Sequence, residues 1–308
     1  MGDARTPILV GPTGVGKTAI ALALAAHWPM EVISADSRQI YRGLDIATAK
    51  ATRKERDRVP HHLVDVVRPG ERYSAGRFAL DAAAAVETIR AAGKLPVVVG
   101  GTGLYVRALV DGLFAEPSID PRAREALGAA IDRMDNASLV RWAGRLDRGY
   151  RGEGGRHRAA RAIEIALLTG QPLSWWQAAA KAQGVVTPWT VRLTAPRHLL
   201  HQRILARTTA MLERGLLEEV AAVLADGAPI EGPGMDGIGV REAVAVLQGR
   251  LPRDLLVSSI ATATRQYAKR QETWFRHQLR GDVLVLDATR PPEQLAASIA
   301  AAWEQQSA

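Results

Sequence analysis

A glycine-rich segment near the N-terminus carries the residue types needed to bind phosphate groups. It reads Gly11-Pro12-Thr13-Gly14-Val15-Gly16-Lys17-Thr18 and lies between the apolar residues 8–10 and 19–22. In the spacing G-x-x-x-x-G-K-T the glycines let backbone N–H groups converge, the lysine adds a positive charge, and the threonine hydroxyl can bind Mg²⁺. The helix expected after it points its positive end at the same place. The spacing predicts a phosphate site with Mg²⁺ near Thr18, but it does not choose among kinases, nucleotide hydrolases and transferases.

A second candidate is Asp36, which directly follows the apolar residues 31–35. In an open parallel sheet the carboxyl ends of the strands face the ligand crevice, so Asp36 should lie beside the phosphate-binding segment. From there a carboxylate can hold Mg²⁺ or accept a proton from a nucleophile. A plain turn cap is the third possibility, since aspartate often bonds to the nearby backbone.

Residues 97–103, VVVGGTG, repeat the strand-then-glycine pattern without an acidic residue at the end of the strand. ATP hydrolysis usually needs a carboxylate there to place the metal and the water, so the pattern weakens an ordinary ATPase interpretation. The glycine pattern at residues 100, 101 and 103 predicts one of two things: a bulky group approaches the backbone closely, or the chain turns tightly into a helix.

Two basic regions favour a polyanionic partner. In residues 156–161 the three-residue spacing of Arg158 and Arg161 puts both on one helix face. In residues 265–276 basic side chains, including Lys269, form a stripe with aromatic neighbours. Such stripes suit phosphodiester backbones and unstacked bases, although solvated helix faces look the same.

Composition limits the class of protein. The chain has 308 residues, 47% of them hydrophobic, which suits one conventional core with a sizeable insertion. Its formal charge of +8 favours nucleic acid or an acidic membrane surface as partner. It has no cysteine, which excludes disulfides, thiol catalysis and Cys-based zinc sites. Because no apolar stretch approaches the ~20 residues of a membrane span, and residues 1–7 have no signal-peptide core, we expect a cytoplasmic protein with no membrane partner.

The order of apolar runs predicts an α/β fold. Strand-like runs at residues 8–10, 31–35, 96–99, 191–194 and 283–286 alternate with helix-period segments, which favours a mostly parallel sheet flanked by helices, of the P-loop NTPase type. Residues 116–189 contain short helical stretches and no strand-like run, so we interpret them as an all-helical insertion. The core domain is then predicted to comprise residues 1–115 and 190–308.

Nearly the whole chain carries, in collinear order, the segments GPTGVGKT, DSRQIYRGLDIATAK, PHHLVD, YSAGRF, VVVGGTGLYVRAL, RAIEIALLTGQPLS, ERGLLEEV, GIGVRE and ATRQYAKRQETWFR. Together they closely resemble the bacterial tRNA dimethylallyltransferase family, also called tRNA isopentenyltransferases. DSRQIY, GGTGLY and ATRQYAKRQ are specific to that family rather than shared by phosphate-loop proteins at large. The resemblance implies transfer of a dimethylallyl group from dimethylallyl diphosphate to the exocyclic amine of the adenosine just 3′ of the anticodon, in tRNAs that read codons beginning with U.

The resemblance also implies roles for matching positions. Asp36 would be the general base at the adenine amine, and Thr13 and Arg207 would act on the diphosphate during catalysis. The whole loop would hold that diphosphate, through Gly11, Pro12, Thr13, Gly14, Val15, Gly16, Lys17 and Thr18, with Mg²⁺ at Thr18. The positions that match tRNA contacts are Asp36, Ser37, Arg38, Gln39, Thr102, Arg124, His157, Arg158, Arg161, Gly239 and Arg241. The partners implied are the tRNA anticodon stem-loop and dimethylallyl diphosphate, and we expect a monomer.

The chain departs from the family pattern at four places. Members commonly carry GTAKP where residues 47–51 read ATAKA, a tyrosine where Val240 stands, an aromatic residue where Thr208 stands, and HPND where residues 152–155 read GEGG. None of these changes removes a proposed catalytic group. The changes at Thr208 and at residues 152–155 bear on the geometry of the tRNA contact.

Other functions remain open on the residues alone. A small-molecule kinase would use the loop for ATP and Asp36 to activate a hydroxyl. An adenylate isopentenyltransferase would act on free nucleotide and would not need the basic insertion. A non-catalytic RNA-binding module would leave Lys17, Thr18 and Asp36 without a role.

Overall fold

The computed structural model describes residues 5–112, 119–152, 154–179 and 184–307. Contacts divide the chain into one unit of residues 1–110 and 185–308 and a second unit of residues 111–184. This division puts the boundaries at 111 and 184, rather than at 116 and 189. The second boundary falls earlier because residues 187–190 already belong to a strand of the sheet.

The first unit contains a six-stranded parallel sheet of order β3-β2-β4-β1-β5-β6. Its strands are β1 (Arg5–Val10), β2 (Met30–Ala35), β3 (His61–His62), β4 (Leu95–Gly100), β5 (Thr187–Thr194) and β6 (Val283–Asp287). Five of them were predicted, and β5 starts earlier than residue 191 because its first residues pair with the start of β1. The edge strand β3 was missed, since two residues carry no periodicity.

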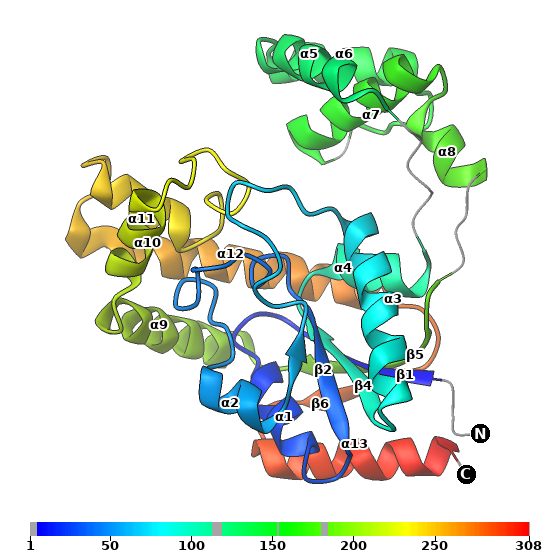
Figure 1. The fold of residues 1–308 in the computed structure, drawn as a ribbon, viewed down its shortest axis with the longest axis vertical. Coiled ribbons are helices and arrows are strands. Elements are labelled where there is room, and N and C mark those ends of the chain that lie inside the picture. Colours follow the sequence, from blue (N-terminus) through cyan, green and yellow to red (C-terminus); the bar gives the residue numbers. More distant parts are fainter. Residues whose placement is uncertain (1–4, 113–118, 153, 180–183, 308) are drawn as a thin grey trace. The chain divides into compact units, whose positions relative to one another are not determined.

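Helices cover both faces of the sheet (Figure 1). The helices of this unit are α1 (Lys17–Leu24), α2 (Arg53–Arg58), α3 (Ala75–Ala91), α4 (Gly103–Val110), α9 (Arg197–Glu213), α10 (Leu216–Ala225), α11 (Val240–Leu247), the 3-10 helix η1 (Arg253–Leu255), α12 (Leu256–Gln278) and α13 (Pro292–Ser307). Helices α1 and α13 pack on one face, and α3, α4 and the end of α12 pack on the other. The α/β prediction is thereby confirmed.

Local sequence explains where the central elements begin and end. Strands β1 and β4 are almost completely buried and are rich in branched apolar residues, as expected for parallel strands covered on both faces. Helix α3 begins after Ser74, whose hydroxyl accepts the Arg77 N–H at 3.1 Å. Its buried face includes Phe78, Ala82 and Val86, at the helical period that predicted it.

All the regular secondary structure in the described residues of the second unit, 111–112, 119–152, 154–179 and 184, is helical. It contains α5 (Pro121–Asp132), α6 (Asn136–Leu146), α7 (Gly155–Thr169) and α8 (Leu173–Ala179). Leu139 and Ile163 are fully buried in a small core that joins α5, α6 and α7. Arg156 donates to the carbonyls of Ile131 and Met134, at and just beyond the C-terminal end of α5, so this arginine has a structural role.

Candidate active site

A crevice of about 1030 Å³ opens at the carboxyl ends of the strands in the first unit. This is where a parallel α/β sheet places its ligand, with β1 between β4 and β5 at the centre. The predicted residues that line it are Thr13, Gly14, Gly16, Lys17, Thr18, Asp36, Ser37, Arg38, Gln39, Arg207, Gly239 and Arg241. Asp36 therefore lies beside the phosphate loop, as its place after β2 predicted.

The phosphate loop joins the end of β1 to the start of α1. Gly16 caps α1 with a φ of 102°, a backbone conformation that other residues adopt only with strain. The Lys17 ammonium folds back and donates to the carbonyls of Gly11 at 2.8 Å and Pro12 at 3.0 Å. Burial lowers the pKa of Lys17 to about 8, and the negative charge of Asp36 partly opposes this effect. The loop thus holds a positive charge at the N-terminal end of a helix, where anions bind.

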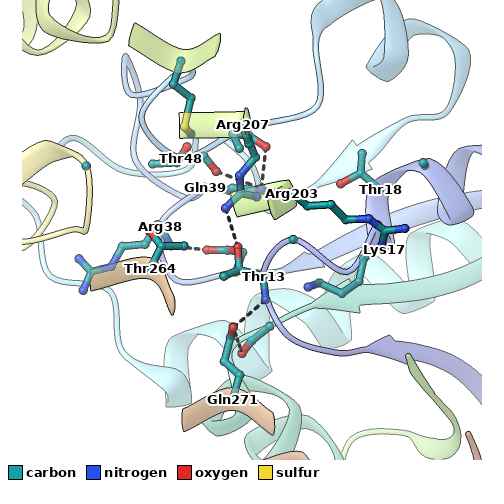
Figure 2. A pocket seen from close by; sticks show the side chains of 18 of the residues that line it. Thr13, Lys17, Thr18, Arg38, Gln39, Thr48, Arg203, Arg207, Thr264 and Gln271 are labelled. Carbon is teal, nitrogen blue, oxygen red and sulfur yellow. Dashed lines mark hydrogen bonds between the residues drawn. The ribbon is translucent and has the colours of Figure 1, made fainter. Parts of the chain in front are cut away.

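Two long side chains reach Thr13 from opposite sides, one from α9 and one from α12 (Figure 2). Arg207 donates to the Thr13 hydroxyl at 2.7 Å, and the Thr13 N–H donates to the Gln271 amide oxygen at 2.8 Å. Burial lowers the pKa of Arg207 while Asp36 raises it, so this guanidinium lies within electrostatic reach of the carboxylate. The structure therefore brings Thr13, Arg207, Lys17 and Asp36 together.

The segment after β2 is held in place by the loop that follows β4. The Asp36 carboxylate accepts the Arg38 N–H at 2.9 Å, which is the turn-capping bond considered from the sequence. The Ser37 N–H donates to the Thr102 hydroxyl at 3.0 Å. Thr102 does not line the crevice itself, but it fixes the residue next to Asp36. The turn cap and a role in proton transfer are compatible, because a carboxylate has two oxygens.

Arg38 and Gln39 are already engaged within the protein. Arg38 donates to the Pro233 carbonyl at 3.0 Å and forms an ion pair with Asp236. The Gln39 amide oxygen accepts the Ser34 hydroxyl at 3.0 Å, and its nitrogen donates to the Ala49 carbonyl at 3.3 Å. Their predicted contacts with tRNA remain predictions.

The glycines of residues 100–103 leave room for parts of the protein itself. A Cβ on Gly100 would lie 2.1 Å from the Ala35 carbonyl oxygen, and one on Gly103 would lie 2.4 Å from the Trp274 ring. Both alternatives are confirmed: β2 and α12 approach these glycines closely, and the chain passes from the end of β4 at Gly100 to the start of α4 at Gly103.

Gly239 and Arg241 lie on the side of the crevice formed by α11. The Glu242 carboxylate is buried and accepts the Gly239 N–H at 2.7 Å and the Arg241 Nε–H at 2.7 Å. Glu242 therefore both caps α11 and orients the Arg241 guanidinium.

The other predicted tRNA contacts belong to the second unit. Arg124 and Arg161 both bind the Glu164 carboxylate, at 2.5 Å and 2.8 Å. His157 and Arg158 are exposed at the start of α7. This unit therefore presents basic side chains at its surface.

Several residues of the site were not predicted from the sequence, among them two that bond to the phosphate loop. Gln271 is buried between the two glycine-containing loops, and Arg203 donates to the Val15 carbonyl at 3.3 Å and the Ala288 carbonyl at 3.1 Å. Arg203 stands four residues before Arg207, and that spacing on one helix could have indicated it. Gln271 lies within the ATRQYAKRQ segment, but nothing in its spacing indicates what it binds.

Comparison with known proteins assigns the family. The model described as IPP transferase matches residues 39–278, and the model described as isopentenyl transferase matches residues 5–63. This chain belongs to the IPP transferase family. The resemblance noted from the sequence is confirmed, and with it the α/β fold of P-loop type.

Relatives of this IPP transferase match over nearly their whole length. A tRNA dimethylallyltransferase of Koribacter versatilis is 42% identical over 282 residues, which cover 90% of this chain and 92% of the relative. One from Anaeromyxobacter dehalogenans is 42% identical over 296 residues, covering 95% and 98%.

Solved structures agree with this assignment. The full-length tRNA isopentenylpyrophosphate transferase of Bacillus halodurans gives a TM-score of 0.71 at 32% identity, over 99% of this chain and 98% of that one. A eukaryotic dimethylallyltransferase, captured in crystallographic snapshots of its action on tRNA, gives a TM-score of 0.82 at 27% identity, over 99% of this chain and 81% of that one.

Proposed function

We propose that this chain is a tRNA dimethylallyltransferase. It transfers a dimethylallyl group from dimethylallyl diphosphate to the N6 amine of the adenosine just 3′ of the anticodon, in tRNAs that read U-starting codons, and releases diphosphate. The observation that carries the proposal is the meeting of a phosphate loop, Arg207 and the Asp36 carboxylate in one crevice. The names of the relatives, which are tRNA dimethylallyltransferases, support the same reaction.

The chemistry follows from the charges in the crevice. The bond between the donor's C1 and its diphosphate oxygen breaks, and a bond from the adenine N6 to C1 forms. Negative charge builds on the departing diphosphate, so donors fixed around it should contribute most to the rate. The groups available are the Lys17 ammonium, the Arg207 guanidinium and the Thr13 hydroxyl.

Asp36 receives the proton that the amine loses. An aromatic amine is a weak nucleophile whose proton needs to leave only as the new bond forms, so a positioned carboxylate should contribute about 10²- to 10⁴-fold. The amine is hard to reach in a stacked anticodon loop. The adenine should therefore be flipped into the crevice, at a cost of a few kcal/mol that new stacking and hydrogen bonds offset.

Magnesium is part of the proposal. Mg²⁺ prefers oxygen ligands, and it commonly keeps several waters while it binds substrate phosphates. The Thr18 hydroxyl lines the crevice, and no cluster of three acidic, histidine or cysteine ligands occurs among the residues that the structure describes. This donor set fits an ion bound mainly through the diphosphate, with Thr18 as its protein ligand. When bound, such an ion would supply positive charge to the leaving group.

The tRNA contact is proposed to use Arg38, Gln39 and Arg241 at the crevice and Arg124, His157, Arg158 and Arg161 on the insertion. We propose that the protein acts as a monomer. None of the described helices is long and apolar enough to cross a membrane.

Incubation of the protein with labelled dimethylallyl diphosphate and tRNA, AMP or ATP, in separate mixtures, tests the proposal. Label in tRNA is expected. Label in AMP would favour an adenylate isopentenyltransferase, and phosphate release from ATP without prenyl transfer would favour a kinase or hydrolase. Either result without label in tRNA would contradict the proposal.

A further inference from the structure

Gln271 connects the two loops that border the crevice. This residue, on α12, is 6% exposed. The amide oxygen accepts the Thr13 N–H of the phosphate loop at 2.8 Å, and the amide nitrogen donates to the Gly101 carbonyl at 2.8 Å. One side chain thereby spans from the loop after β1 to the loop after β4.

Only a side chain with both a donor and an acceptor at this reach can make these two bonds. A carboxylate lacks the donor, and an apolar side chain lacks both. Asparagine has the groups but is one methylene shorter. Loss of the amide would leave the Thr13 N–H and the Gly101 carbonyl without these partners, which is costly for buried groups.

The absence of a side chain at Gly101 leaves room for the Gln271 amide. A Cβ on Gly101 would lie 2.3 Å from the Gln271 amide nitrogen. A Cβ on Gly103 would instead meet the ring of Trp274, which belongs to the same helix as Gln271. Helix α12 therefore sits directly on the loop after β4, and the Gln271 amide fills the space that a larger residue at 101 would need.

The bond to Thr13 affects the group that faces the leaving diphosphate. The Thr13 backbone N–H donates to Gln271 and therefore already has a hydrogen-bond partner within the protein. The Thr13 hydroxyl points toward Arg207, from which it accepts a hydrogen bond at 2.7 Å. Figure 2 shows Thr13 held between these two side chains. Main-chain and side-chain orientation at Thr13 are thus fixed from α12 and α9 respectively.

We infer that Gln271 is a positioning residue for prenyl transfer, which holds Thr13 so that its hydroxyl faces the departing diphosphate. This inference rests on the proposed function. Gln271 acts through Thr13 and does not touch the reacting atoms. Its loss should therefore lower the rate of the chemical step more than the affinity for tRNA.

The first test compares Gln271→Leu with Gln278→Leu, which makes the same change at an exposed position near the end of α12. The kcat of Gln271→Leu with tRNA and dimethylallyl diphosphate should fall by about 10²-fold, the loss typical when a donor to a developing anion is misplaced. The KM for tRNA should stay close to that of the wild type, and Gln278→Leu should behave as wild type. An unchanged kcat for Gln271→Leu would overturn the inference.

A double-mutant cycle tests whether Gln271 acts through Thr13. In a Thr13→Ala background, where the hydroxyl is already absent, Gln271→Leu should cause little further loss of kcat, because residues that act as one unit are not additive. A further loss as large as that in the wild-type background would overturn the inference.

Gly101→Ala provides a second route if Gln271→Leu does not fold. Its methyl group would displace the Gln271 amide without removing it, and we expect the same fall in kcat with a thermal midpoint near that of the wild type. Wild-type kcat in a folded Gly101→Ala would overturn the inference. Absence of label transfer to tRNA by the wild-type protein would overturn the proposed function instead, so the two failures are distinguishable.

Discussion

At the scale of single residues, the crevice places charged side chains next to each of the two reacting partners. Lys17 and Arg207 lie on the phosphate side, and Asp36 lies near enough to oppose the lowering of their pKa values by burial. This separation suits a reaction in which one partner gains negative charge while the other loses a proton.

Removal of the Asp36 charge should slow the chemical step while it leaves diphosphate binding largely unchanged. Asp36→Asn keeps the size of the side chain and an oxygen that can accept the Arg38 N–H, but it cannot take the amine proton. We expect kcat to fall by about 10²- to 10⁴-fold. The affinity for diphosphate, measured by calorimetry, should change little. Turnover at the wild-type rate would exclude the general-base role.

The lowered pKa of Lys17 predicts how donor binding depends on pH. In the free protein Lys17 becomes neutral as pH rises above about 8, and the diphosphate binds best to the charged form. The dissociation constant for dimethylallyl diphosphate should rise about tenfold between pH 7 and pH 9, as expected for one proton with that pKa. Calorimetry across this range measures it. Lys17→Met should bind more weakly and lose this pH dependence, and an identical pH profile for both proteins would contradict the assignment.

At the scale of elements, α10 fixes the segment that follows Asp36 and Gln39. The Glu219 carboxylate accepts the N–H groups of Asp45 and Ile46 with one oxygen, at 2.8 and 2.7 Å, and that of Ala47 with the other, at 2.8 Å. A buried lysine, Lys50, then binds Asp45 and Asp65 at 2.7 and 2.6 Å. These bonds shape the loop whose carbonyls hold Gln39.

Glu219→Ala should therefore lower stability. It leaves three backbone N–H groups without an ionised acceptor, and we expect a loss of about 3 kcal/mol in the free energy of unfolding. Urea denaturation measures it. The neighbouring Glu218 is exposed, so Glu218→Ala is the matched control and should change stability by less than about 0.5 kcal/mol. Equal effects of the two substitutions would show that the loop does not depend on Glu219.

At the scale of the whole molecule, the charge of +8 predicts salt-dependent binding of tRNA. Arg158→Ala together with Arg161→Ala should weaken tRNA binding at low salt and reduce the slope of log affinity against log salt by about 1 to 2. Filter binding over a range of salt concentrations measures this slope. Arg250→Ala together with Arg253→Ala removes the same two charges at exposed sites of the first unit and controls for the change in net charge. Unchanged affinity of the double variant at low salt would exclude the insertion contact.

Several parts of this protein could be predicted from the sequence because they depend on local pattern. The phosphate loop, the strand before Asp36 and helix α3 each follow from residues close together in the chain, because glycine spacing, apolar runs and helical periods are local properties. Collinear segments were sufficient to identify the family.

The folded structure was needed to show which groups from distant parts of the chain come into contact. Arg207 and Gln271 reach Thr13 across 194 and 258 residues of chain, and spacing cannot predict such contacts. It also showed that the space above Gly100 and Gly103 is filled by β2 and α12. Strand order and helix packing set these approaches, since they bring the ends of β1, β2 and β4 to one edge of the sheet.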